Sequence, residues 1–247
     1  MKTITRFLCL TAAIALAIPA FAADFEGKVE MRIKSPEMAV LSKNSTMLMN
    51  FYAKGPKMRM DMKPDGEAAG FGAMMGDVFV LYDKDKKEIT SIMPAMKMAM
   101  VMKEPEAKPD ATTQADSPNA AFKATGKTDT ILGYKAEEYV STAETGEYVE
   151  MWVTKELGTF RMMQQQQDGK AAAPKGHEKF LLDNKLFPLK MTVYKKKGDA
   201  QPVVQLEVLK VDKSAQPDSL FQIPDGIKKM DMSKLQQDLE ALKGLGE

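Results

Sequence analysis

The sequence predicts a mainly β protein: one curved antiparallel sheet, an unclosed half-barrel, with a short C-terminal helix. Two observations predict this fold. Apolar residues alternate with charged residues at a period of two along most of the chain, as they do in half-buried strands. Short turn segments rich in Gly, Pro and Asp separate these stretches. Strands and amphipathic helices do not alternate, which argues against a parallel α/β fold.

The first 22 residues are expected to be a secretory signal peptide. Lys2 and Arg6 precede an apolar run over residues 7–18, and a small-x-small pattern ends at Ala22. We place cleavage after Ala22 and expect a periplasmic protein without a transmembrane segment in its mature chain. The one cysteine of the sequence, Cys9, lies in this segment. The mature chain therefore has neither disulfides nor thiolate metal ligands.

Residues 23–247 are expected to form a single β-rich domain, whose strands can be read in order. The predicted strands are one at residues 24–34, two around Gly55-Pro56, a hairpin turning at residues 83–87, a strand after Pro94, a hairpin around Thr145-Gly146 and two strands around Gly198-Asp199. Residues 103–121 and 163–176 are polar and are expected to be flexible loops. Residues 233–244 predict a short helix, with Ser233 as N-cap and a leucine stripe.

Composition argues against several classes of function. The sequence holds 35 Lys and Arg against 34 Asp and Glu, so no strongly basic surface for nucleic acid is expected. His177 is the one histidine, and it lies beside a polar loop, where a solvent-facing side chain is expected. No nucleophile elbow, HExxH motif or phosphate-binding loop is present. We therefore expect no enzyme, no cofactor, no catalytic residue and no His, Cys or carboxylate metal site.

Methionine dominates the apolar faces of several predicted strands. The sequence contains 21 methionines, and many recur at every second position. In a strand, such residues lie on one face about 6.8 Å apart. The expected ladders are Met96, Met98, Met100 and Met102; Met58, Met60 and Met62; and Met47 with Met49. Neighbouring strands would merge these ladders into one methionine-lined surface.

Three interpretations of this surface remain open, besides an ordinary core. Flexible, polarisable methionines suit a surface that accepts a hydrophobic ligand. Soft thioethers also select Cu(I), and the extracytoplasmic space is where copper is handled, so a periplasmic Cu(I)-binding protein is an alternative. A further alternative is an envelope assembly or stress factor that binds a protein partner. Trp152, the one tryptophan, is expected to lie in the core or in a cavity wall.

Five segments resemble an exported bacterial family catalogued as domain of unknown function 4412. They are FYAKGPKMRMDM, TGKTDTILGYKAEEY, EYVEMWVTKELGTF, LFPLKM and DSLFQIPDGIKKMDM, and the resemblance runs over about residues 24 to 232. This family is similar to the lipoprotein carriers LolA, LolB and RseB. The resemblance implies a curved open sheet lidded by helices, whose hollow binds acyl chains or lipidated partners. Ala136 stands where relatives are expected to carry cysteine, so the resemblance implies no redox role there.

The residues and the resemblance together predict a monomeric, non-enzymatic periplasmic protein. Its concave, methionine-rich face is expected to bind a hydrophobic ligand, either a lipid or the acyl chain of a lipoprotein. Selectivity would come from the shape of the apolar surface rather than from charge. The candidate ligand-binding residues are Met58, Met60, Met62, Met96, Met98, Met100, Met102 and Trp152.

Overall fold

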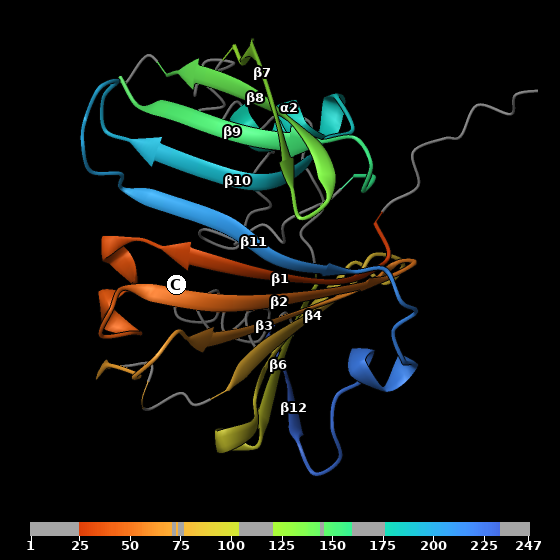
Figure 1. The fold of residues 1–247 in the computed structure, drawn as a ribbon. Coiled ribbons are helices and arrows are strands. Elements are labelled where there is room, and N and C mark those ends of the chain that lie inside the picture. The colour runs from red at the N-terminus through yellow and green to blue at the C-terminus, as the bar shows by residue number, and fades with distance from the viewer. Residues whose placement is uncertain are drawn as a thin grey trace, which may run out of the picture.

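A computed structural model describes residues 25–70, 73, 77–103, 121–143, 146–159 and 176–232 (Figure 1). The strands are β1 (Gly27–Lys34), β2 (Thr46–Lys54), β3 (Lys57–Pro64), β4 (Val78–Asp83), β5 (Glu88–Met93), β6 (Met98–Lys103), β7 (Lys123–Ile131), β8 (Tyr134–Thr142), β9 (Tyr148–Thr154), β10 (Phe187–Tyr194), β11 (Val204–Asp212) and β12 (Lys228–Asp231). The helical segments are η1 (Pro36–Val40), η2 (Pro94–Met96), α2 (Gly176–Asp183) and η3 (Asp218–Phe221).

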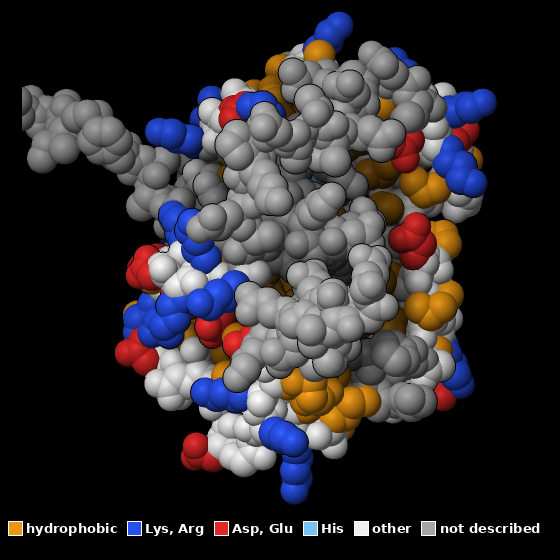
Figure 2. All heavy atoms as spheres, turned by 180° about the vertical axis from the view of Figure 1, so that it is seen from behind, with side chains coloured by type: hydrophobic (Ala, Val, Ile, Leu, Met, Phe, Trp, Pro, Cys, Tyr) orange, Lys and Arg blue, Asp and Glu red, His pale blue; other side chains and the backbone are white. Residues whose placement is uncertain are grey.

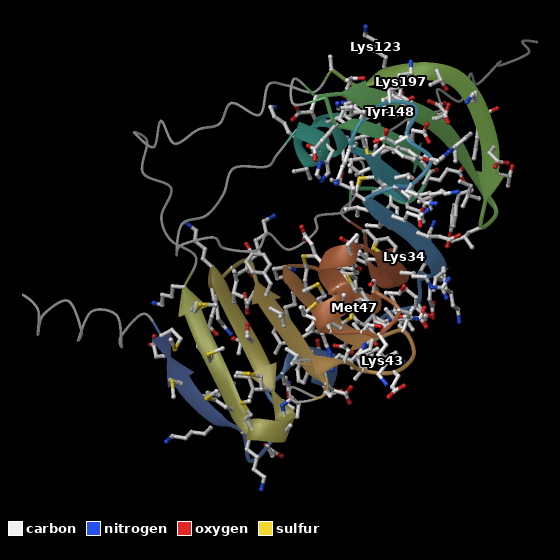
Figure 3. All side chains as sticks on the ribbon, turned by 90° about the vertical axis from the view of Figure 1, so that its left-hand side faces the viewer. Lys34, Lys43, Met47, Lys123, Tyr148 and Lys197 are labelled. Atoms are coloured by element: carbon white, nitrogen blue, oxygen red, sulfur yellow. The ribbon has the colours of Figure 1, made fainter. Side chains whose placement is uncertain are left out.

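All these strands belong to one sheet of 12 strands that does not close on itself. Its order is β12-β6-β5-β4-β3-β2-β1-β11-β10-β9-β8-β7, so two antiparallel meanders, β1 to β6 and β7 to β11, meet where β1 pairs with β11. Figure 3 shows both halves of the sheet turning toward the same side. The predicted mainly β fold, an unclosed half-barrel, is confirmed.

The structure corrects two details of the prediction. β12 pairs with β6 in parallel, so the sheet is not antiparallel throughout. A short helix, α2, begins at Gly176, where the sequence pattern indicated only the end of a polar loop. The predicted signal peptide (1–22), the C-terminal helix (233–244) and most of the two predicted loops lie outside the described residues.

The main core lies on one side of the sheet, which we call the inner face. We define this face by Met31, Met49 and Met62, which lie opposite one another on β1, β2 and β3. Buried residues from β1 to β11 and from α2 join this core; they include Val29, Phe51, Met151, Leu181, Phe187 and Leu206. The opposite, outer face carries the charged side chains of β1 and β3, including Arg32 and Arg59.

The junction of the two meanders is held by close packing at the start of β1. Gly27 has a φ of 131°, and a Cβ atom placed on it would lie 2.1 Å from the backbone oxygen of Asp212. Next to it, the ring of Phe25 lies 5.6 Å from that of Phe187, so the start of the described chain packs onto β10. A bulge after Glu30 lets β11 follow the bend of β1.

Residues 213–227, which we call the strap, lead from β11 in the middle of the sheet to β12 at its edge. Ile223 and Ile227 of the strap pack on a second, smaller core on the outer face, formed by Phe79, Leu81, Ile92 and Ala99. Arg59 donates a hydrogen bond of 3.1 Å to the backbone oxygen of Leu220. The strap therefore covers the outer face of β4 to β6 and leads into β12, the last described strand.

We predict that Gly27→Ala strongly destabilises the fold. The new methyl group would meet the backbone of β11, and the positive φ adds about 1–3 kcal/mol of strain. Gly133→Ala is the matched control, because Gly133 also has a positive φ but open space around it. Urea unfolding should show a larger loss for Gly27→Ala than for Gly133→Ala; equal losses would contradict the close approach of β1 and β11.

Candidate functional site

The methionine ladder of β3 lies on the inner face, as the sequence predicted. Met62 lies opposite Met49 of β2 and Val78 of β4, and Met60 lies opposite Phe51 and Val80. Met58 continues the ladder between Ala53 and Tyr82. The ladders of β2 and β3 therefore merge into one apolar surface.

A second group of methionines occupies the same face of β5 and β6. Met98 lies opposite Met93, Met100 opposite Ser91, and Met102 opposite Ile89. Strand β4 lies between this group and the ladder of β3. The ladders of β3 and β6 themselves are three strand spacings apart, about 14 Å. The expected single methionine surface is two surfaces, joined by Val78, Val80 and Tyr82 of β4.

Met96 does not belong to the ladder that the sequence predicted. It ends the short helical turn η2, and Lys97 follows with a φ of 51°. The side chain of Met96 is 49% exposed. Pro94 explains the difference, because a proline cannot donate a backbone hydrogen bond to a neighbouring strand and starts a turn here. The ladder of β6 therefore has three methionines, Met98, Met100 and Met102.

Trp152 points to the face of β9 opposite Met151 and is half-buried against the main core. It pairs with Glu138 of β8 and Lys190 of β10, whereas its neighbour Met151 pairs with Tyr139 and Met191 on the inner face. Side chains alternate along a strand, so Trp152 and Met151 point to opposite sides. The expectation that Trp152 belongs to the core agrees with its packing, although its side chain leaves β9 on the side opposite Met151.

Burial divides the inner-face methionines into two classes. Met31 and Met151 are fully buried, and Met47, Met60, Met93 and Met191 are also part of the buried interior. Met49, Met58, Met62, Met98, Met100 and Met102 are only half-buried. Figure 2 shows the face away from the viewer of Figure 1, where hydrophobic side chains gather beside charged ones at the margins. The half-buried class is a candidate contact surface.

The inner face of the other meander is covered by α2. Phe180 stacks on Phe122 at 4.7 Å between ring centroids and lies 5.2 Å from the ring of Tyr139 on β8. Leu181 is buried in the main core. Sequence reasoning missed this helix, because its eight residues are too few to show a helical period. The half-exposed apolar surface therefore concentrates on β2 to β6.

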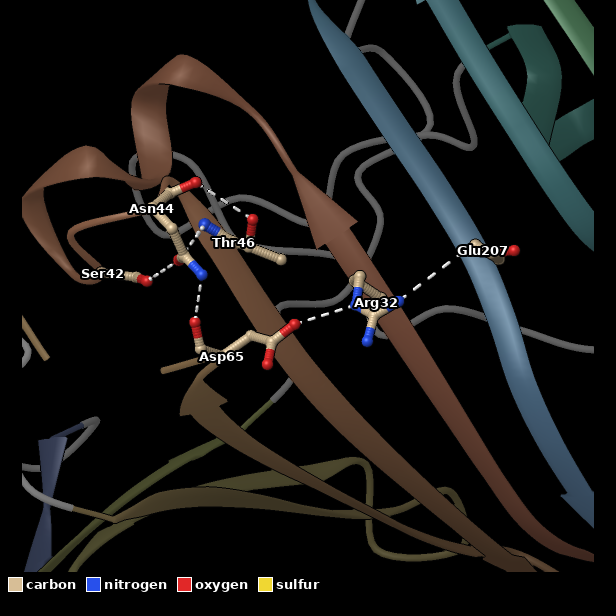
Figure 4. Close-up of polar contacts among 6 residues, drawn as sticks. All are labelled: Arg32, Ser42, Asn44, Thr46, Asp65 and Glu207. Carbon is tan, nitrogen blue, oxygen red and sulfur yellow. Dashed lines mark hydrogen bonds and ion pairs between the residues drawn. The ribbon is translucent and has the colours of Figure 1, made fainter. Parts of the chain in front are cut away.

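A polar network fixes one end of this surface (Figure 4). The backbone amide of Thr46 donates to the side-chain oxygen of Asn44 at 3.2 Å, and the Asn44 amide donates to the backbone oxygen of Asp65. Arg32 holds the Asp65 carboxylate at 2.8 Å and reaches Glu207 of β11 at 3.9 Å. These contacts tie the loop before β2 to the end of β3 and hold the adjacent Met47 in place.

Charged groups of β1 and β3 neutralise one another on the outer face. Arg59 pairs with Asp61 at 2.6 Å, and its guanidinium lies 3.9 Å from the ring centroid of Phe79. The hydrogen bond from Lys28 to Glu30 raises the pKa of Lys28 and lowers that of Glu30. Because these charges point outward, the inner face of β3 presents methionine and no ionic group.

In the described part of the chain, no three His, Cys, Asp or Glu side chains gather to hold a metal ion. None of its helices combines the length and apolar character that crossing a bilayer requires. Ala136, where the resemblance implied cysteine in relatives, is fully buried in the core. The site is therefore an apolar surface.

Comparison with known proteins identifies a family and several distant structures. The model of the family described as domain of unknown function (DUF4412) matches residues 25–227. No curated protein matches the chain closely enough to count as a relative. An uncharacterized conserved protein from Thermus thermophilus aligns at 11% identity with a TM-score of 0.46, covering 83% of this chain and 91% of that one.

Two further structures align over only part of their own length. MucB of Pseudomonas aeruginosa, solved in complex with MucA, aligns at 10% identity with a TM-score of 0.42, covering 81% of this chain and 56% of that one. The protein PNGF-II aligns at 15% identity with a TM-score of 0.38, covering 85% of this chain and 32% of that one.

We predict that replacing Met60 by alanine destabilises the fold more than replacing Met58 by alanine, because Met60 belongs to the core and Met58 to the contact surface. Both lie on the inner face of β3, but Met60 is buried and Met58 is half-buried. Met60→Ala should lower the free energy of unfolding by about 2–5 kcal/mol, as buried methionines do. Met58→Ala should cost clearly less. Urea denaturation of both variants measures this, and equal losses would contradict the division of the inner face.

We predict an acid-sensitive stabilisation at Glu138 on the outer face. Burial alone would raise the pKa of this carboxyl, but hydrogen bonds from Thr125 at 2.7 Å and Lys127 at 3.0 Å outweigh it and lower the pKa. The ionised group therefore stabilises the fold above its unfolded-state pKa, and this stability is lost as the pH falls through the lower folded-state pKa.

Glu138→Gln tests this directly, because glutamine resembles the protonated acid. Near neutral pH the variant should be less stable by about 1.5–3 kcal/mol, the range for hydrogen bonds to a charged group. The difference should shrink as the pH falls. Urea unfolding followed by Trp152 fluorescence measures it, and Lys127→Met should show a smaller change of the same sign. A difference independent of pH would argue against an ionised Glu138.

Proposed function

Because the chain belongs to the family described as domain of unknown function (DUF4412), a description that assigns no activity, we propose a function from its own residues. The protein is a non-enzymatic periplasmic binding protein. Its ligand is hydrophobic, a lipid or the acyl chain of a lipoprotein, and it lies against the inner face of β2 to β6.

The half-buried methionines of the inner face carry this proposal. A core that serves stability alone buries its large apolar side chains, as Met31 and Met151 do here. The methionines of β3 and β6 instead keep part of their surface open while they point to the concave side. Contiguous apolar surface that remains accessible is a feature of ligand-binding and interaction sites when it is large.

The chemistry of methionine favours an acyl chain as the ligand. Its unbranched thioether adapts to irregular apolar shapes, so one surface accepts chains that differ in length or branching. The ionic groups of β3, Arg59 and Asp61, lie on the outer face and leave no charged side chain of this strand against the ligand. Binding would then be driven by burial of apolar area.

The proposed contact set follows from the register. It consists of Met58, Met62, Met98, Met100 and Met102, together with Val80 and Tyr82 between the two methionine groups. Met60 supports this surface from the core. Met96 and Trp152 leave the set, because one lies in the turn η2 and the other points to the side of β9 opposite Met151.

The N-terminal pattern supports the location. A charged start, an apolar run and a small-x-small site ending at Ala22 are typical of secretory signal peptides. Lipid and lipoprotein acyl chains that cross the periplasm need apolar cover, which a protein of this kind would supply.

The decisive experiment is titration of the mature protein with a dansyl-labelled fatty acid. We predict saturable binding by the native protein. Met100→Lys should weaken it by at least about tenfold, because a charge would enter the apolar contact surface. Met100→Leu should keep the affinity, because leucine preserves apolar volume.

Met96→Lys is the matched control, because it places the same charge on an exposed methionine of the turn η2. This variant should bind like the native protein. Absence of saturable binding by the native protein would refute the proposal and favour a protein partner. Equal weakening by Met96→Lys and Met100→Lys would place the fatty acid elsewhere.

A further inference from the structure

Methionines from three adjacent strands meet at one corner of the sheet. Met93 of β5 lies opposite Met98 of β6, and Met100 of β6 lies opposite Met230 of β12. Residues directly opposite each other in a sheet share a face and have Cβ atoms about 4.5–5.5 Å apart. These four side chains therefore occupy four of the six positions in a patch of the inner face that is two residues long and three strands wide. We call it the methionine corner.

The contribution of β12 could not be read from the ladders of the sequence. Met230 follows Met100 by 130 positions, and only the parallel pairing of β12 with β6 brings them together. The strap makes this pairing possible, because it packs on the outer face and leads the chain to the edge of the sheet. The parallel strand thus adds a sulfur ligand to an edge that already carries three.

Solvent reaches this corner. Four large hydrophobic side chains are exposed among the described residues: Val40, Met96, Leu132 and Met230. The two methionines of this set both lie at the corner, Met230 on β12 and Met96 in the turn between Met93 and Met98. Packing explains neither exposed position, whereas a site for a ligand from solution requires such access.

The donor atoms at the methionine corner are thioether sulfurs, which bind few metal ions. Thioethers are soft ligands that bind without losing a proton, and among biological metal ions they select Cu(I). The two other polar neighbours on this face are Ser91, opposite Met100, and Lys228, opposite Met98. Neither is a ligand for a hard cation. Lys228 is exposed, and a long lysine side chain at such a position keeps its ammonium group hydrated.

We infer that the methionine corner binds a single Cu(I) ion. Three thioether ligands come from two strands: Met98 and Met100 from β6, and Met230 from β12. The buried Met93 lies beside Met98 on β5. The long, flexible methionine side chains allow the sulfur atoms to converge on one ion. This site does not depend on the hydrophobic ligand proposed above, since it uses the sulfur atoms and not the apolar volume.

Replacement of methionine by leucine tests the role of the sulfur atoms in Cu(I) binding. The triple variant Met98→Leu, Met100→Leu and Met230→Leu removes three sulfur atoms but keeps the apolar surface. Its matched control is the triple variant Met49→Leu, Met58→Leu and Met62→Leu, which removes three half-buried inner-face methionines from β2 and β3. Both variants leave the fully buried methionines intact, so both should fold.

The measurement is anaerobic Cu(I) transfer from the chromophoric chelator bathocuproine disulfonate, with Ag(I) binding by native mass spectrometry as a redox-inert check. The native protein and the β2–β3 control should each take up one ion. The corner variant should bind at least about a hundredfold more weakly. Affinity should change little from neutral to mildly acidic pH, because thioethers carry no proton to displace.

Two results would overturn the inference. One is failure of the native protein to compete for Cu(I); the other is equal Cu(I) affinity in the corner variant and the native protein. The dansyl fatty acid distinguishes this outcome from failure of the proposed function. Met230 lies outside the proposed fatty-acid contact set, so Met230→Leu alone should weaken Cu(I) binding and leave fatty-acid binding unchanged.

Discussion

The antiparallel pairing of β1 with β11 is the interaction on which the architecture depends. It joins two meanders that are otherwise independent ribbons of sheet, and it sets the bend between them. Gly27 permits this pairing because its backbone meets Asp212 where a side chain would not fit. The rings of Phe25 and Phe187 then pack against each other beside the junction. The pairing of β1 with β11 therefore sets the orientation of the two halves of the sheet relative to each other.

The two halves of the open sheet are covered by different segments, on different faces. The half formed by β7 to β10 receives α2 on its inner face, where Phe180 packs on Tyr139. The half formed by β2 to β6 receives the strap on its outer face, where Ile223 and Ile227 complete a small core. Both halves contribute to the main core on the inner face, and the half formed by β2 to β6 gains a second core on its outer face. The methionines Met98, Met100 and Met102 remain half-buried on the inner face of this half.

The period-two alternation allowed most strands to be predicted, because side-chain direction along a strand is a local property. The hairpins around Gly55-Pro56 and residues 83–87 and the strand β1 follow from this pattern and from turn residues. The face of each ladder also followed, since only one parity of β3 avoids placing Arg59 and Asp61 in the interior. The family resemblance was likewise confirmed over residues 25–227.

What could not be predicted depends on contacts between distant segments. The position of Trp152 relative to the inner face is decided by its pairing with Lys190, which the alternation within β9 does not determine. The parallel position of β12 depends on the path of the strap, and α2 is too short to show a helical period. Met96 was mispredicted for a local reason that was visible, since Pro94 interrupts the strand pattern.

The strap also determines when the edge of the sheet can form. β12 is the last described strand to be synthesised, and its partner β6 is completed 125 positions earlier, at Lys103 against Lys228. Until the strap has packed on Ile92 and Ala99, the backbone of β6 has one unpaired side. Pairing over such a long sequence separation is slow because the loop must close first. Completion of this edge is thus a late folding event, and a chain that stops before Lys228 leaves β6 as an exposed strand open to aggregation.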